Sequence, residues 1–461
     1  MRLSRLFVLT TLACVACGAR TTLDGPNAGG GGGDHTGGGG AAPQGGDGGV
    51  GAGPVGGSGG SGGSGGGTVT TIISTSPDSF FEGETDVKAA PNGFVVAAWI
   101  SVDNNAGSSF ISYAFSTDFG DTWGSPIRAE NPPLSNASDP VLTVDESGTF
   151  YLTWVAYDIV GGGQPGNMTV LVARAPAGVP EFDPAIAAVA GTPNDLRDKP
   201  WIAHTPEGTI MVTFAEANGT GFDAVAVRSF DGANWERNTI MHDGAFNIFR
   251  NLIYPCTDPI DGGRLHAVWV ALDQGLNASI ETAFSDDLGA NWSAPIPVSD
   301  PGELVAFTDP TCVVRGNEVL VSYGLTEDPA GEGDTPILFA TQMKRSVDGG
   351  LSFGSAVNVQ ETSMAMLPTL SRDLSGTIGL TYYVGDFFGD TNGSFRITTS
   401  PNADSGFAPT SVVANPVVFT PIRADIDWLG DYSGIAALDG HFYMTFVDNS
   451  SGISHVAFAR R

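Results

Sequence analysis

Positive charge is scarce in this sequence. Its 461 residues include only 20 Lys and Arg against 50 Asp and Glu, which gives a formal net charge of -30 at pH 7. Proteins that bind DNA or RNA neutralise phosphates with a cationic surface, so this balance excludes nucleic acid as a partner. Charged residues make up only 15% of the chain, which disfavours coiled coils and long solvated helices.

Histidine and cysteine are also rare. The six histidines show no zinc-type spacing, and the chain has neither a Gly-x-Ser-x-Gly elbow nor a phosphate-binding loop outside its glycine-rich segment. We therefore expect no required cofactor. Of the four cysteines, only Cys256 and Cys312 lie beyond residue 17. They could form a disulfide if the protein is exported, or remain two buried thiols.

Long hydrophobic runs are missing apart from the N-terminus. Arg2 and Arg5 precede a run of eleven largely apolar residues from Leu6 to Ala16, which is too short to span a bilayer but typical of an export signal. The following Cys17 resembles the lipidated cysteine of a bacterial lipobox. Residues 1–16 are thus predicted to be a signal peptide, with lipidation at Cys17; the alternative is an ordinary secretory signal.

Glycine, by contrast, is abundant just after this cysteine. Residues 21–70 contain 25 glycines, and such a stretch cannot bury apolar surface. We expect residues 17–67 to be a flexible tether that carries the lipid. This predicts anchoring in the bacterial outer membrane, facing the periplasm or the exterior, with membrane contact through the lipid only; otherwise the protein is secreted.

A short motif recurs along residues 68–461. Ser116-Thr-Asp-Phe-Gly-Asp-Thr-Trp123 is followed by Ser285-Asp-Asp-Leu-Gly-Ala-Asn-Trp292 and Ser346-Val-Asp-Gly-Gly-Leu-Ser-Phe353, with a shorter version at Ser229-Phe-Asp-Gly-Ala-Asn-Trp235. Each copy follows a strand-like run. With similar runs that end at 175, 400 and 459, the spacing is 54 to 61 residues.

A second series has a similar period. Pairs of strand-like runs joined by Gly- or Asn-containing turns are typical of β-hairpins. The second run of each pair ends near an aromatic residue, and these aromatic residues recur every 54 to 64 positions. These aromatic residues are Trp99, Trp154, Phe214, Trp269, Tyr323, Tyr382 and Phe446.

Four antiparallel strands in every unit of about 57 residues are typical of a propeller blade. The sequence therefore predicts an all-β, seven-bladed β-propeller over residues 68–461, with a six-bladed sialidase-type propeller as the alternative. The last unit ends at Arg461 after its third strand. We expect the β-prone segment 68–76 to supply the missing outer strand and to close the ring.

The repeated Ser-x-Asp-x-Gly-x-Thr-Trp pattern resembles the Asp-box, or BNR repeat, of the sialidase superfamily. The resemblance implies a structural role for Asp118, Asp231, Asp287 and Asp348, which should accept backbone N–H groups in their turns. It also implies exo-sialidase-like glycoside hydrolysis as one function. Two features depart from the family: no arginine lies between Arg20 and Arg128, where an Arg-Ile-Pro motif is expected, and the repeats number seven rather than six.

Polar residues gather where each outer strand should lead into the next inner strand. Equivalent loops of a propeller face one central channel, so these residues should surround its mouth. The catalytic candidates there are Arg197, Arg250, Arg423, Asp139, Asp431 and Tyr432. The binding candidates are Glu84, Asp198, Tyr254 and Asp309. Lys199 lies in the same region but receives no role. Alternatively, these residues only end strands, cap turns or form surface ion pairs.

Asp425 and Asp427 are two positions apart, so in an extended segment their side chains would point to the same side. Such hard oxygen ligands could bind Ca²⁺, although the spacing is not that of an EF-hand, and solvated acids are the alternative.

Three functions remain compatible with the sequence. The first is a monomeric cell-surface propeller that binds an extracellular glycan or protein at its funnel face. The second is a sialidase-like glycoside hydrolase, and the third is a structural scaffold of the envelope. Propellers host all three, so the fold does not decide between them.

Overall fold

The computed structural model describes most of residues 69–461. The described ranges are 69–75, 77, 80–103, 105–131, 133–160, 164–219, 221–241, 249–273, 275, 277–306, 308–326, 339–357, 359, 365–385, 393–417 and 429–461. All of them belong to a single compact unit. The signal peptide, Cys17, the tether, Arg423, Asp425 and Asp427 lie outside the described residues.

The described part of the chain is built from β-strands and turns, without an α-helix. It therefore contains no helix long and apolar enough to cross a membrane. Most strands pair with their neighbours in sequence through short turns, as the alternating hairpin pattern predicts.

Four sheets contain four antiparallel strands each. Their strands are β2 (Phe80–Ala89), β3 (Val95–Asp103), β4 (Ser108–Ser116) and β5 (Ile127–Arg128); β6 (Asn136–Val144), β7 (Phe150–Val160), β8 (Gln164–Ala175) and β9 (Ile186–Val189); β21 (Ala365–Arg372), β22 (Ile378–Val384), β23 (Gly393–Ser400) and β24 (Ser411–Val417); and β25 (Gly434–Leu438), β26 (His441–Asp448), β27 (His455–Arg460) and β1 (Val69–Ile72).

An eight-stranded sheet consists of two such groups, joined by one parallel pair between Phe222 and Phe249. The groups are β10 (Arg197–His204), β11 (Ile210–Ala217), β12 (Phe222–Ser229) and β13 (Glu236–Met241), then β14 (Phe249–Asp258), β15 (Gly262–Leu272), β16 (Ala278–Ser285) and β17 (Ile296–Pro297). A three-stranded sheet contains β18 (Thr311–Arg315), β19 (Glu318–Thr326) and β20 (Phe339–Ser346).

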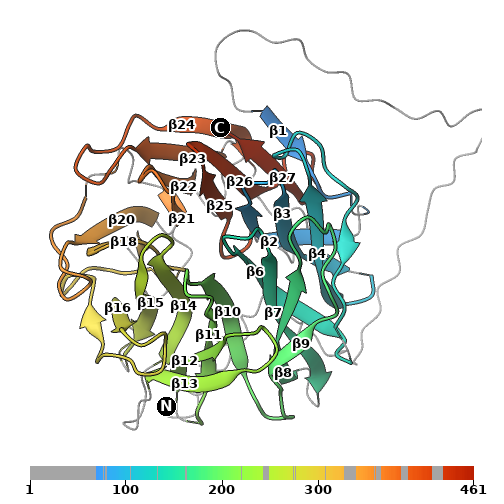
Figure 1. The fold of residues 1–461 in the computed structure, drawn as a ribbon. Helices are drawn as coiled ribbons and strands as arrows, with labels where there is room; N and C mark the ends of the chain where they lie inside the picture. The colour runs from blue at the N-terminus through green and yellow to red at the C-terminus, as the bar shows by residue number, and fades with distance from the viewer. Residues whose placement is uncertain are drawn as a thin grey trace, which may run out of the picture. The chain divides into compact units, whose positions relative to one another are not determined.

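The first strands of these groups follow one another around a common centre. Their order of contact is β2, β6, β10, β14, β18, β21, β25 and again β2. In Figure 1, β2, β6 and β10 lie side by side near this centre. The chain is therefore a β-propeller with four-stranded antiparallel blades.

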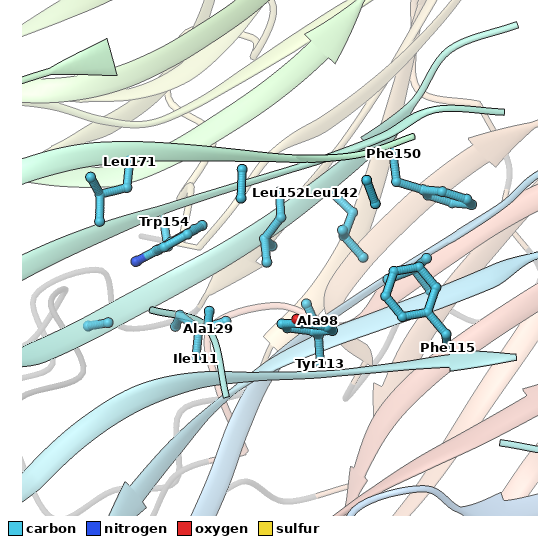
Figure 2. Packing of buried hydrophobic residues seen from close by; sticks show 14 of the residues in the cluster. Ala98, Ile111, Tyr113, Phe115, Ala129, Leu142, Phe150, Leu152, Trp154 and Leu171 are labelled. Carbon is cyan, nitrogen blue, oxygen red and sulfur yellow. The ribbon is translucent and has the colours of Figure 1, made fainter. Parts of the chain in front are cut away.

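The aromatic residues that close the predicted hairpins form the core between sheets. All of them lie on the second strand of a group and have no exposed surface. Figure 2 shows one such interface, where Trp154, Leu152 and Leu171 face Ile111 and Tyr113 of the preceding sheet. Because these bulky side chains recur once per unit, each sheet acquires a comparable apolar layer to pack on the next.

The N-terminal strand closes the ring. β1 pairs antiparallel with β27, from Val69 opposite Arg460 to Ile72 opposite Ala457. Ile73 continues the pairing through its N–H to the Val456 carbonyl at 2.9 Å, and its side chain is buried. The outer strand expected from segment 68–76 is thus present, and it ties the first described residues to the last sheet.

The turns with the repeated Asp behave as the sequence predicts. Asp118 Oδ1 accepts the Thr122 N–H at 2.8 Å and the Ser116 hydroxyl at 2.7 Å. The equivalent carboxylates of Asp231, Asp287 and Asp348 accept N–H groups in their own turns. Hydrogen bonds of this kind lower the pKa of Asp118 to about 2. Trp123, Trp235 and Trp292 pack against the hydrophobic clusters, as expected.

Cys256 and Cys312 form a disulfide with their Cα atoms 5.9 Å apart. They belong to β14 and β18, the first strands of two adjacent groups. The sequence left this bond and two free thiols open; the structure contains the bond, which covalently joins neighbouring parts of the ring.

Candidate functional site

The first strands share a backbone irregularity that shapes the centre of the ring. In five of them the register gains one residue, which is a β-bulge. The residue that opens each bulge has a positive φ. These residues are Glu84 (47°), Asp139 (60°), Lys199 (50°), Leu252 (59°) and Leu367 (52°). Non-glycine residues rarely adopt this conformation, so the same unusual backbone position recurs around the centre of the ring.

Lys199 is the focus of a buried ion cluster. Its ammonium Nζ lies 2.7 Å from Asp139 Oδ1 and 2.7 Å from Asp431 Oδ2, and it also donates to Glu84 Oε1. The side chains of Lys199 and Glu84 have no exposed surface, whereas that of Asp431 is 30% exposed. Three carboxylates from separate parts of the ring therefore meet one ammonium, and Asp431 connects the cluster to solvent.

Two tyrosines and a tryptophan form an aromatic wall beside the ions. The ring of Tyr432 lies 5.5 Å from Lys199 Nζ, and its hydroxyl donates to the Pro140 carbonyl at 3.0 Å. The Trp201 ring centroid lies 5.0 Å from that of Tyr432 and 4.6 Å from that of Tyr254. Aromatic faces next to hydrogen-bonding groups are suited to a ligand with both apolar and polar surfaces.

Asp309 also belongs to this centre. It is 3% exposed, and neither carboxylate oxygen has a hydrogen-bond partner among the residues that the structure describes. The charges of Lys199, Asp431, Asp139 and Asp198 all act on it. Asp198 itself accepts the Asn251 amide at 2.7 Å.

Burial controls the protonation of the cluster. Desolvation, followed by repulsion from Asp139, raises the pKa of Glu84 well above its usual value. Desolvation likewise raises the pKa of Asp309 well above the ordinary range. Burial alone would lower the pKa of Lys199, but attraction by Asp139, Asp431 and Glu84 outweighs it and raises that pKa. The site thus combines a permanent cation with carboxyl groups that hold protons more tightly than usual.

The structure brings together most, but not all, of the residues expected at the channel mouth. Glu84, Asp139, Asp309, Asp431 and Tyr432 surround Lys199, and Tyr254 and Asp198 lie beside them. Arg423, Asp425 and Asp427 fall outside the described residues, so the Ca²⁺ expectation stays untested. Among the residues that are described, no group of three or more His, Cys, Asp and Glu side chains is arranged to hold a metal ion.

The contacts of Arg197 lie away from the cluster. Arg197 binds Glu216 at 2.8 Å and Asp195 at 3.0 Å, and it donates to the Met168 carbonyl. Arg250 Nε lies 3.7 Å from Glu281 Oε2. The sequence predicted these arginines in loops at the channel mouth. The structure places Arg197 and Arg250 at the beginning of β10 and β14, and the side chain of Arg197 extends toward β8 and β11.

Sequence reasoning placed Lys199 at the channel mouth but assigned it no role, and its central position in the ion cluster was not expected. It lies between Asp198 and Pro200 at the start of an inner strand, and it is equivalent to Glu84 and Asp139 in distance from the closing aromatic. That distance is 15 residues for Glu84 to Trp99, Asp139 to Trp154 and Lys199 to Phe214. This equal spacing agrees with the expectation that equivalent positions surround one channel, but it does not show which side chains meet.

No known family model matches the chain, and no curated protein matches it. Solved structures with a similar fold include an ulvan lyase, described as a new family of polysaccharide lyase, with a TM-score of 0.56 and 11% identity over 84% of this chain and 95% of the lyase. A protein of unknown function from Dyadobacter fermentans has a TM-score of 0.51 and 18% identity, over 85% of this chain and 97% of its own. The phage phi92 endosialidase has a TM-score of 0.50 and 10% identity, over 85% of this chain and 68% of its own. At these identities the similarity shows the propeller fold alone.

Proposed function

We propose that this protein binds a glycan at the centre of its propeller, in the site formed by Lys199, Glu84, Asp139, Asp431 and the adjacent aromatic wall. The convergence of three carboxylates on Lys199 from separate parts of the ring is the observation that carries this proposal. Hydroxyl groups of sugars hydrogen-bond to charged groups of this type, and sugar rings pack on aromatic faces. Trp201 and Tyr432 are buried and Tyr254 is the partly exposed member of the aromatic wall. Such a small accessible face suits a sugar ring better than a protein partner, which would require a broad exposed apolar surface.

Binding of the full-length chain to a panel of immobilised extracellular glycans tests this proposal. We expect binding to at least one glycan class and its loss in Asp431→Asn, because Asp431 is the cluster residue with solvent access. Asp404→Asn is the matched control, since Asp404 is 78% exposed and pairs with Arg345. Absence of binding to every glycan, or equal binding by Asp431→Asn, would favour the structural scaffold instead.

A glycoside hydrolase is the second candidate. Such enzymes use a carboxylic acid that holds a proton near neutral pH and a second carboxylate or Tyr as nucleophile or base. Glu84 and Asp309 have raised pKa values, and Asp431 and Tyr432 lie in the same cluster. Two of the structural neighbours are by name a polysaccharide lyase and an endosialidase. Turnover of fluorogenic glycosides that disappears in Tyr432→Phe with folding intact would support hydrolysis, and no turnover on any glycoside would leave binding alone.

The proposed architecture has seven blades of the Asp-box type. The eight-stranded sheet counts as two blades because one parallel pair joins its halves, and the contacts of the first strands run through all groups and back to β2. The hydrogen-bonded turns at Asp118, Asp231, Asp287 and Asp348 support the Asp-box assignment.

We further propose that the protein is exported and held at the bacterial envelope by a lipid on Cys17. The Cys256–Cys312 disulfide supports export, because such bonds persist in oxidising compartments. A glycan-binding propeller on a membrane anchor would then face extracellular or periplasmic polysaccharides.

A further inference from the structure

His266 is a buried imidazole that the fold leaves without a hydrogen bond. It lies on β15 and is 1% exposed, and neither of its ring nitrogens has a partner among the residues that the structure describes. A neutral imidazole carries one N–H donor and one acceptor nitrogen. Native proteins pair nearly all buried polar groups, because an unsatisfied one destabilises the folded state. A histidine at this position therefore weakens the fold where an apolar residue would not.

The repeat shows that other residues fit the same position. His266 lies three residues before the closing aromatic Trp269, and the equivalent positions of the other units hold Val96, Tyr151, Met211, Leu320, Gly379 and Tyr443. Met211 also matches His266 in its packing against a glycine of an Asp-containing turn. A Cβ added to Gly289 would lie 3.5 Å from Met211 Sδ, and a Cβ added to Gly350 would lie 2.6 Å from His266 Cε1. The fold thus accommodates a thioether where this unit has an imidazole.

The imidazole lies in the seam between the group β14–β17 and the group β18–β20. His266 is the backbone partner of Cys256, so the two side chains lie on the same face of the sheet. Cys256 is bonded to Cys312 of β18. The turn 346–353, which follows β20, contacts β15 at the same seam, because Arg264 donates to the Gly349 carbonyl at 2.8 Å. The imidazole, the disulfide and one Asp-containing turn therefore meet at a single seam.

A proton on His266 would place a charge in this seam without a free carboxylate to receive it. Arg264 repels such a charge, and Asp286 attracts it but is itself bound to Arg264 at 2.7 Å. The other charged residues on the surrounding strands and the covering turn have contacts of their own; they are Asp258, Arg315, Glu318, Lys344, Arg345 and Asp348. Burial, followed by repulsion from Arg264, lowers the pKa of His266 to about 4.

We propose that this seam is an acid-sensitive switch, in which protonation of His266 separates the turn 346–353 from β15 while the Cys256–Cys312 disulfide keeps the two groups joined. The seam then closes again when the pH rises. This inference does not depend on the proposed glycan binding.

The sign of the pH dependence follows from the two states of the seam. In the open seam His266 is solvated and binds a proton with the ordinary histidine pKa of about 6.5. In the closed seam it binds that proton only near pH 4. The closed seam therefore keeps its full stability above about pH 6.5 and loses it as the pH falls toward about 4.

The disulfide reports whether the seam is open. Cys256 and Cys312 are 6% and 2% exposed, so a reductant reaches them only after opening. Reduction of the full-length chain by tris(2-carboxyethyl)phosphine is followed by alkylation and peptide mass spectrometry, with oxidised glutathione as the exposed reference disulfide. Relative to this reference, we expect reduction to be about 50-fold faster at about pH 4.5 than at about pH 7.5, as the difference between the two pKa values gives.

The variant His266→Met removes the titrating group and introduces the residue of the equivalent position 211. Its relative rate of reduction should be nearly the same at both pH values, and its melting temperature at about pH 5 should exceed that of the wild type, because no buried group then gains a proton on opening. His441→Met is the matched control, since His441 is exposed, and it should keep the acceleration in acid. Equal acceleration in His266→Met and the wild type would overturn the switch.

Hydrogen exchange of the wild type decides even if His266→Met does not fold. After correction for the intrinsic exchange rate, the turn 346–353 over His266 should exchange faster at about pH 4.5 than at about pH 7.5. The turn 285–292 lies over Met211 and should show no such change. Equal acceleration of both turns would indicate general loosening in acid, and acceleration of neither would show that the seam stays closed; each result contradicts the inference.

Discussion

One backbone position, repeated around the ring, determines what the centre contains. The residue that opens each inner-strand bulge has a left-handed φ, and at three of these positions it is charged: Glu84, Asp139 and Lys199. At Leu252 and Leu367 the same position is apolar. A bulge changes the direction of its side chain, which then no longer follows the regular alternation between the two faces of the strand. The same backbone conformation therefore carries charged residues that form the ion cluster at three positions and leucines of the hydrophobic core at two.

Lys199 should hold the cluster together. Lys199→Met leaves Glu84, Asp139 and Asp431 without their cation, and breaking a buried ion cluster in this way costs about 3–5 kcal/mol of unfolding free energy. Loss of the attraction raises the pKa of Glu84 further, so the folded state binds a proton that the unfolded state releases above its ordinary pKa. Stability then falls as pH rises, and the loss measured by urea unfolding should be larger at about pH 8 than at about pH 5.

Lys88→Met is the control for this measurement. Lys88 pairs with Asp86 at 2.7 Å but is 24% exposed, so its removal should cost less than about 1 kcal/mol. Equal losses in the two variants, or a larger loss for Lys199→Met at the lower pH, would contradict the role assigned to the cluster.

At the scale of elements, neighbouring groups are joined by repeated contacts of their arginines. Arg228 donates to the Leu288 carbonyl at 3.0 Å, Arg264 to that of Gly349 at 2.8 Å, and Arg460 to that of Phe119 at 2.8 Å. Each of these carbonyls lies in an Asp-containing turn of the next group around the ring. Three of the arginines thus join neighbouring groups, including the last group to the first.

The closing strand β1 can be tested by a pair of neighbouring residues. Ile73 is 3% exposed and packs with Val87 and Tyr443, whereas Ile72 is 45% exposed. Ile73→Ala should lower the unfolding free energy by about 2–5 kcal/mol, because it leaves a cavity at the seam. Ile72→Ala should change it by about 0.5 kcal/mol or less. Denaturant unfolding of the full-length variants gives both values, and equal values would show that the N-terminal strand does not stabilise the closed ring.

At the scale of the whole molecule, the acidic charge belongs to the propeller and not to the N-terminal segment. Residues 1–67 hold three Arg against three Asp, so the net charge of -30 arises in residues 68–461. A strongly acidic domain is repelled by anionic lipid surfaces. Attachment to a membrane would therefore depend on the proposed lipid and not on the protein surface.

Replacement of the lipidated cysteine tests this attachment. We expect Cys17→Ser to move the protein from the membrane fraction of cells to the soluble fraction, because no lipid can then be added. Cys14→Ser is the matched control in the same segment and should remain with the membranes. An unchanged membrane fraction for Cys17→Ser, or release of both variants, would refute the anchor at Cys17.

The repeating features of the fold were readable from the sequence because they depend on short-range patterns. Trp99 and its equivalents recur at the period of a unit, and Asp118 and its equivalents form hydrogen bonds within four residues. The β-prone residues before the first unit and the missing last strand predicted the closure between β1 and β27. Each of these follows from local hydrogen bonding or from alternation along a single strand.

The centre was decided only by the tertiary structure. Glu84 and Lys199 are separated by 115 residues in the chain. Local sequence patterns place both residues at equivalent positions of the ring, but they do not determine which of these side chains contact each other. The same holds for Arg197, which turns to Glu216 and away from the centre, and for the disulfide between Cys256 and Cys312. Bulges and sheet packing fix these directions, because a change of one residue in register moves a side chain to the other face of its strand.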